Sequence, residues 1–200
     1  MVRKQKTKRD FFSRNYSKSW KFIVDSKKFI YSIIAVFFGF ALFGFLVPVP
    51  DYISQEIMKI LEEILRQTEG LSQFELIQFI FFNNLQSSFF GLILGIFLGI
   101  FPVMFAAFNG YILGFVADVA VEAGGFGVLW RLLPHGIFEL PAVFISLGLG
   151  LRFGISVLKI TKLKMLKDYF YDLGRVFVFI VIPLLIIAAL IEGSLIFLLG

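Results

Sequence analysis

The chain has no cysteine and a single histidine among its 200 residues. The absence of cysteine excludes disulfides, thiolate catalysis and metal sites with cysteine ligands. One histidine also excludes a metal site with several histidine ligands from one chain. Charged residues are scarce: they make up 16% of the chain, against about 25% in soluble domains. The composition therefore excludes an ordinary soluble domain.

Apolar side chains dominate instead. Hydrophobic residues account for 58% of the chain, aromatic residues for 18%, and phenylalanine alone occurs 28 times. This composition suits side chains that pack between helices and against lipid. We predict an all-α polytopic membrane protein: a helical bundle with about five transmembrane or re-entrant helices, plus amphipathic N-terminal and outer helices.

The few charges are distributed unevenly along the chain. Residues 1–28 contain ten basic and two acidic residues, and residues 152–175 contain six basic and two acidic residues. Residues 51–75 show the opposite balance, with six acidic and two basic residues. The positive-inside rule predicts that the first two segments are cytoplasmic. A basic tail can also bind nucleic acid, but attraction to anionic lipid heads explains it beside a membrane span, so we expect no nucleic-acid partner.

Two segments can be distinguished along the chain: a basic cytoplasmic N-terminal segment, residues 1–28, and a single membrane domain, residues 29–200. Residues 10–28 have aromatic residues at helical spacing and are typical of an amphipathic helix on the inner leaflet. This segment is too polar, and the apolar run after it too long, for a cleavable signal peptide.

Residues 29–49 are uncharged and span about 30 Å as a helix, one hydrocarbon thickness. Residues 51–70 predict an amphipathic outer helix, with Asp51 as its N-cap and Gly70 as its stop.

A capping box at Ser72 and Glu75 predicts the start of the next helix. We expect further membrane helices over about 76–101, 103–121, 135–152 and 176–198, with Pro102 as the break between the first two and a basic cytoplasmic loop over 152–175. The turn before Pro102 carries no charge, so these two helices either span fully or form a buried re-entrant hairpin. Both alternatives put the N-terminus in the cytoplasm and the C-terminus outside the cell membrane.

His135 and Glu139 lie four residues apart and so share one helix face near the outer leaflet. Three interpretations compete: a hydrogen-bonded pair that stabilises the helix start, a proton- or ion-handling site, and a metal site for which His135 and Glu139 alone supply too few ligands. Asn83, Asn84, Asn109 and Glu192 can join them in one polar cluster. Asn109-Gly110 can also mark an irregular turn.

Glycines recur on the helices that must approach for these polar groups to meet. Gly91, Gly95 and Gly99 follow one another at four-residue spacing, which is typical of close helix packing in membranes. We assign the same packing role to Gly110 and Gly148.

Five features of the sequence occur together: Asn84, the glycines up to Pro102, Asn109-Gly110, the block Pro134-His135-Gly136-Ile137-Phe138-Glu139, and residues 148–154. This combination resembles the stage II sporulation protein M family. The resemblance covers roughly residues 29–193. It implies a multi-pass membrane protein with about five spans and no established enzymatic activity. In endospore formers the family works with peptidoglycan-degrading partners, but members also occur in archaea and in bacteria that form no spores.

Three functions remain open. The first is a non-enzymatic scaffold or assembly component without cofactors, whose partners are the lipid bilayer and either a second copy or another cell-envelope protein. The second is a small-solute or ion transporter that uses the polar cluster. The third is an intramembrane metal hydrolase, which lacks the ligands expected for metal-assisted hydrolysis.

Overall fold

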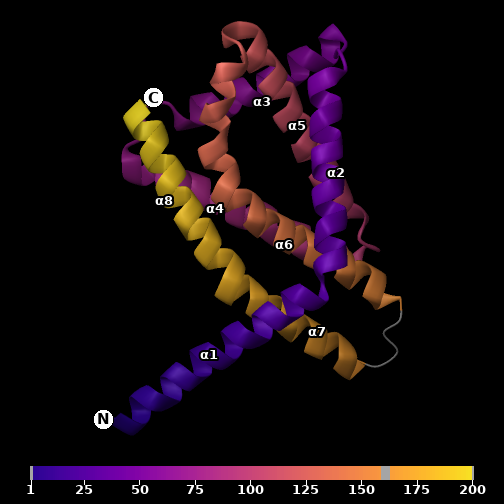
Figure 1. Ribbon diagram of the computed structural model, residues 1–200, viewed down its shortest axis with the longest axis vertical. Helices are drawn as coiled ribbons and strands as arrows, with labels where there is room; N and C mark the ends of the chain where they lie inside the picture. The colour runs from indigo at the N-terminus through magenta and orange to yellow at the C-terminus, as the bar shows by residue number, and fades with distance from the viewer. Residues whose placement is uncertain (1, 159–162, 200) are drawn as a thin grey trace.

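The computed structural model describes the backbone of residues 2–158 and 163–199, and the side chains of residues 10–129, 139–158 and 164–198. It is 92% helical, and no strand occurs in these backbone ranges. Five helices of the described chain are long and apolar enough to cross a membrane. The predicted all-α membrane bundle is therefore confirmed (Figure 1).

The N-terminal segment forms a helix, as predicted for residues 10–28. Helix α1 (Val2–Asp25) is followed by α2 (Lys27–Leu46), and the single residue between them, Ser26, is not helical. The polar α1 and the apolar α2 point in clearly different directions (Figure 1). The first span ends at Val47, which is extended because the residue before a proline is disfavoured in a helix.

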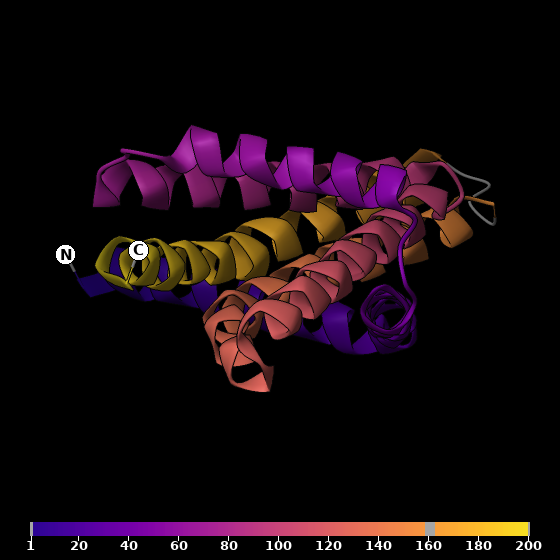
Figure 2. The same cartoon turned by 90° about the horizontal axis from the view of Figure 1, so that it is seen from above.

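The outer helix begins and ends close to its predicted positions, and its successor begins at the predicted cap. Helix α3 (Asp51–Thr68) follows Pro50, so Asp51 is its first residue rather than its N-cap. Gly70 adopts the left-handed conformation after the helix, as expected of a stop. The predicted capping box at Ser72 and Glu75 is present at the start of α4 (Gln73–Ile93). Figure 2 shows α2 nearly end-on and α3 lengthwise, apart from it.

The predicted break at Pro102 is wrong by a few residues. Helix α4 passes into a short 3-10 turn (Leu94–Ile96), and the chain reverses at Phe97 to Gly99, where Leu98 and Gly99 have positive φ. Helix α5 (Ile100–Gly124) has already begun when Pro102 occurs. A proline is harmless in the first turn of a helix, because the N–H it lacks would have no partner there.

Helix α5 is also continuous through Asn109-Gly110, so the alternative of an irregular turn at this pair is wrong. The side-chain amide of Asn109 donates to the carbonyl of Phe105 on the same helix, at 2.8 Å.

The predicted basic loop over 152–175 is mostly helical. After the 3-10 segment Phe126–Leu132, helix α6 (Leu133–Val157) continues well past residue 152, and α7 (Leu163–Val176) follows. Helix α7 leads through a π-helical turn (Phe177–Val181) into α8 (Ile182–Leu199) without a break. The periodic apolar residues of α7 account for the difference, since an amphipathic helix can pack against the bundle despite its charges.

Helix α6 is the most enclosed of the five spans. Half of its apolar window is buried, against 17% for α2. Its Phe144 packs edge-on against Phe37 of α2, with ring centroids 5.1 Å apart, and its Phe153 stacks on Tyr169 of α7 at 5.4 Å. The core therefore lies around α6, between α2 and the run from α7 to α8.

Candidate functional site

Two buried polar residues define the candidate site. Glu139 on α6 and Asn84 on α4 are each only 8% exposed. Helix α6 carries Pro141 two residues after Glu139, and a proline removes one backbone hydrogen bond from a helix interior. Burial of a carboxyl and an amide is costly in an apolar bundle, so both positions are candidates for a specific role.

Glycines bring α4 and α6 into backbone contact. A Cβ atom on Gly95 would overlap the backbone of Gly150, and one on Gly154 would overlap the carbonyl oxygen of Gly95. A Cβ atom on Gly91 would overlap the side chain of Leu147, and one on Gly99 would meet Leu151. Later residues of α4 meet later residues of α6, so the two helices run parallel.

This register relates Asn84 to Glu139. Gly95 meets Gly150 and Gly154, which lie 55 and 59 residues further along the chain. Asn84 and Glu139 are also 55 residues apart. Both residues precede this crossing: Asn84 lies seven residues before Gly91 on α4, and Glu139 lies eight residues before Leu147 on α6.

The other glycines predicted to pack contact α2. A Cβ atom on Gly148 would come within 2.7 Å of the Cα of Ile30, and one on Gly110 would overlap the carbonyl oxygen of Phe37. Gly110 thus belongs to a second crossing, between α5 and α2, rather than to the crossing of α4 with α6.

The remaining predicted polar residues are placed differently. Asn83 is exposed and approaches the amide oxygen of Asn84 at 3.5 Å. Asn109 is exposed and bonds to its own helix, so the structure separates it from Asn84 and Glu139. His135 lies in the first turn of α6, but its side chain falls outside the described residues.

Glu192 lies near the end of α8. A Cβ atom on its neighbour Gly193 would come within 3.0 Å of the backbone of Ile77, and Gln73 donates to Ser194 at 3.0 Å. Asn84 is seven residues from Ile77, or about 10 Å along α4. Glu192 therefore lies at the level where α4 begins, about 10 Å along this helix from Asn84.

Two serines that the sequence analysis did not assign to the site extend it. Ser88 and Ser146 are fully buried, and neither hydroxyl has a hydrogen-bond partner among the described residues. Ser88 lies one turn after Asn84, and Ser146 lies one turn before Gly150. The sequence does contain a signal that Ser146 faces a neighbouring helix. Small residues recur at four-residue spacing in an unbroken row: Ala142, Ser146, Gly150 and Gly154.

The described side chains of this site can donate and accept hydrogen bonds. No group of three or more His, Asp or Glu residues that could hold a metal ion occurs among the described residues. The described donors are a carboxyl, an amide and two hydroxyls, a set that falls short of the three or four ligands of a protein zinc site.

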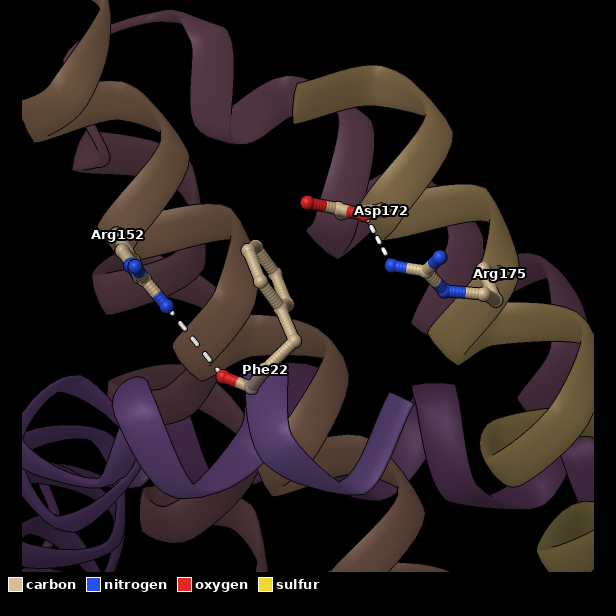
Figure 3. A network of polar contacts seen from close by, with 4 residues as sticks. All are labelled: Phe22, Arg152, Asp172 and Arg175. Atoms are coloured by element: carbon tan, nitrogen blue, oxygen red, sulfur yellow. Dashed lines mark hydrogen bonds and ion pairs between the residues drawn. The ribbon is translucent and has the colours of Figure 1, made fainter. Parts of the chain in front are cut away.

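A second polar site, which the sequence analysis missed, anchors α1. Arg152 of α6 donates to the hydroxyl of Ser26 at 2.6 Å and to the carbonyl of Phe22 at 3.3 Å. Its guanidinium also lies 4.6 Å from the centre of the Phe22 ring. Figure 3 shows this contact beside the ion pair of Arg175 with Asp172 on α7. The end of α1 is thus attached to the central helix of the bundle.

The family model for stage II sporulation protein M matches residues 33–195. The chain belongs to the stage II sporulation protein M family. The matched range includes every candidate polar residue from Asn83 to Glu192 and leaves α1 outside it.

This member of the family is 30% identical to an uncharacterised protein of Methanocaldococcus jannaschii over 154 residues, which cover 74% of this chain and 67% of the relative. No solved structure matches the chain significantly.

Proposed function

We propose that this member of the stage II sporulation protein M family is a non-enzymatic membrane scaffold or assembly component that acts through protein contacts. The observation that carries the proposal is the incompletely covered apolar face of α3. Ile57 is buried, but Ile60 and Ile64 are nearly half exposed and Leu65 is 67% exposed. An apolar helix face outside the bundle is typical of a contact surface.

Charge favours a protein partner for this face. The opposite side of α3 carries several carboxylates, and the chain continues through the acidic Glu69 and Glu75. An acidic helix is repelled by anionic lipid heads, whereas a protein surface can supply both apolar and basic groups. We infer that the partner is a second copy of the chain or another membrane or cell-envelope protein.

The packing of the polar site also favours a scaffold. Asn84 and Glu139 precede the crossing at which the backbones of α4 and α6 are in contact, a geometry that stabilises a rigid unit. Two surface cavities of the described chain border neither residue: one lies between α1 and α8, the other at the end of α3.

The proposal includes an orientation in the cell membrane, with the N-terminus in the cytoplasm and the C-terminus outside. Its support is the clustering of basic residues in α1, in α7 and at Arg152, which contacts the end of α1. Helix α3 then lies on the outer side, where it meets partners outside the cytoplasm.

Photocrosslinking in native membranes tests the scaffold. A benzophenone side chain at Leu65 should yield one defined adduct, either a dimer or a complex with one partner. The same group at Glu63, on the polar side of α3, is the matched control and should yield little. Monomer alone at Leu65, or equal adducts at both positions, would count against the proposal.

A second candidate function is transport, and the buried hydroxyls of Ser88 and Ser146 favour it. They are buried like Asn84 and Glu139, and the four residues lie on α4 and α6, two on each helix. Transport predicts flux of a small solute or ion in proteoliposomes that Glu139→Gln abolishes. Crosslinking at Leu65 with no flux across a panel of solutes would favour the scaffold over transport.

A further inference from the structure

A surface groove of about 650 Å³ separates α1 from the start of α8. Phe12, Ser13, Tyr16 and Ser17 line it on α1, and Phe179 and Pro183 line it on the other side. Figure 1 shows that α1 and α8 diverge from the region where they meet, so the groove lies in the angle between a polar helix and an apolar one.

Pro183 accounts for the shape of this groove. A proline cannot donate to the carbonyl four residues earlier, here that of Phe179, and its ring crowds the preceding turn. The helix widens into a π-turn directly before it, Phe177–Val181. The ring of Phe179 then packs edge-on against Phe11 and Phe12, at 6.2 and 5.9 Å between centroids, and forms one end of the groove.

The groove has an apolar floor and a polar rim. Its floor consists mainly of aromatic and aliphatic side chains, whereas Ser13 and Ser17 present hydroxyls along α1. Ser17 lies one helical turn from both Arg14 and Lys21, so their side chains can reach the same edge.

The charge of α1 as a whole is basic, although Asp10 and Asp25 share the stripe of Arg14 and Lys21. In the described part of α1, Arg14, Lys18 and Lys21 outnumber Asp10 and Asp25, and the preceding residues 3–9 contain five further basic side chains. An amphiphile with an apolar tail and a negative head matches both parts of the groove. A water-soluble anion leaves the aromatic floor uncovered, and a neutral lipid leaves the basic edge unpaired.

We propose that this groove binds one anionic glycerophospholipid. An acyl chain lies against Phe12, Phe179 and Pro183, and the phosphate accepts hydrogen bonds from Ser13 and Ser17 and pairs with Lys21. Arg152 supports the site indirectly, because it holds the end of α1 against the bundle.

Fluorescence quenching tests the proposal on the full-length chain. Trp20 is exposed one turn from Tyr16, and Trp130→Phe removes the other tryptophan. The protein is reconstituted in phosphatidylcholine bilayers containing brominated phosphatidylglycerol or brominated phosphatidylcholine. Trp20 should be quenched by the anionic lipid at several-fold lower mole fraction than by the neutral one.

Three variants identify the site. Lys21→Gln should reduce the preference for phosphatidylglycerol by roughly five-fold, the contribution of one basic residue near an anionic surface. Ser13→Leu fills the groove without changing charge and should abolish the preference. Lys164→Gln on α7 removes the same charge away from the groove and should leave the preference unchanged.

Equal quenching by the two lipids would overturn the proposal. So would a preference that survives Ser13→Leu, or one that falls as much in Lys164→Gln as in Lys21→Gln, since either result would indicate general surface attraction. Far-UV circular dichroism verifies that each variant is folded. If the Ser13→Leu variant is not folded, the comparison of Lys21→Gln with Lys164→Gln decides the test by itself.

Discussion

Replacing Gly114 by alanine should destabilise the bundle, whereas the same replacement at Gly39 should not. Gly114 lies at the crossing of α5 with α2, and a Cβ atom there would overlap the carbonyl oxygen of Ala41 and lie 2.9 Å from the backbone nitrogen of Phe45. A Cβ atom on Gly39, in α2 itself, would have no neighbour within 4 Å.

The two substitutions share one favourable contribution. Alanine is more stable than glycine in a helix interior by about 1 kcal/mol, so Gly39→Ala should stabilise the protein by up to that amount. Overpacking costs about 1–3 kcal/mol, and at Gly114 the obstructing atoms belong to backbone, which cannot rotate away. We therefore expect a net loss of about 1–2 kcal/mol for Gly114→Ala and a difference of about 2–3 kcal/mol between the variants.

Reversible unfolding in mixed micelles of dodecyl maltoside and dodecyl sulfate, followed by far-UV circular dichroism, measures both free energies. Gly110→Ala provides a second test at the same crossing, because its Cβ atom would overlap the carbonyl oxygen of Phe37. Equal stability of the Gly114 and Gly39 variants would show that α2 and α5 are not in backbone contact, and the reasoning would be refuted.

Three further substitutions test other contacts. Arg152→Met removes the bonds to Ser26 and to the end of α1. A hydrogen bond from a charged donor contributes about 1.5–3 kcal/mol, so amide exchange in the last turns of α1 should accelerate at least about ten-fold. Ser72→Ala removes the capping box with Glu75 and should cost about 1 kcal/mol in unfolding experiments. Ser146→Ala removes a buried hydroxyl without a partner among the described residues, so the same experiments should show no loss of stability or a gain of up to about 1 kcal/mol.

Each substitution has a matched control. Lys164→Met removes an exposed basic residue and should leave exchange in α1 unchanged. Glu75→Gln keeps the capping box, since glutamine also suits that position. Ser54→Ala removes a partly exposed serine from α3. Unchanged exchange in Arg152→Met, full stability of Ser72→Ala, or a clear loss in Ser146→Ala would each contradict the corresponding contact.

Features that depend on neighbours along the chain could be predicted from the sequence. The capping box at Ser72, the stop at Gly70 and the existence of five apolar helices all follow from local side-chain chemistry and from helix length. The reversal between α4 and α5 was predicted near Pro102, because proline often ends helices. Its actual position at Phe97 to Gly99 follows from the contact of Gly99 with Leu151, which the sequence does not display.

The direction in which polar side chains point was harder to predict. Helix α5 is apolar on all sides, as expected of a helix that faces both lipid and protein, so no periodicity indicated that Asn109 faces away from Asn84. Gly44 was missed for the same reason, because only the approach of α2 to α5 reveals its role. Gly114 was missed although it follows Gly110 by four residues, a spacing typical of close helix packing in membranes.

Helix directions provide one more test of the predicted orientation. Gly110 meets Phe37 and Gly114 meets Ala41, so α2 and α5 run parallel. Arg152 meets the end of α1, whereas Gly193 meets Ile77 at the start of α4. The start of α2 and the start of α4 therefore lie at opposite faces of the bundle, the first beside the basic segments and the second beside α3.

The absence of cysteine makes this arrangement testable by labelling, because any introduced cysteine is the sole thiol. A membrane-impermeant maleimide should label Leu65→Cys, on α3, in intact cells. It should label Lys164→Cys, on α7, only after permeabilisation, since basic segments are retained in the cytoplasm. The reverse pattern would place the basic segments outside, and labelling of both positions in intact cells would show that they do not lie on opposite sides of the membrane.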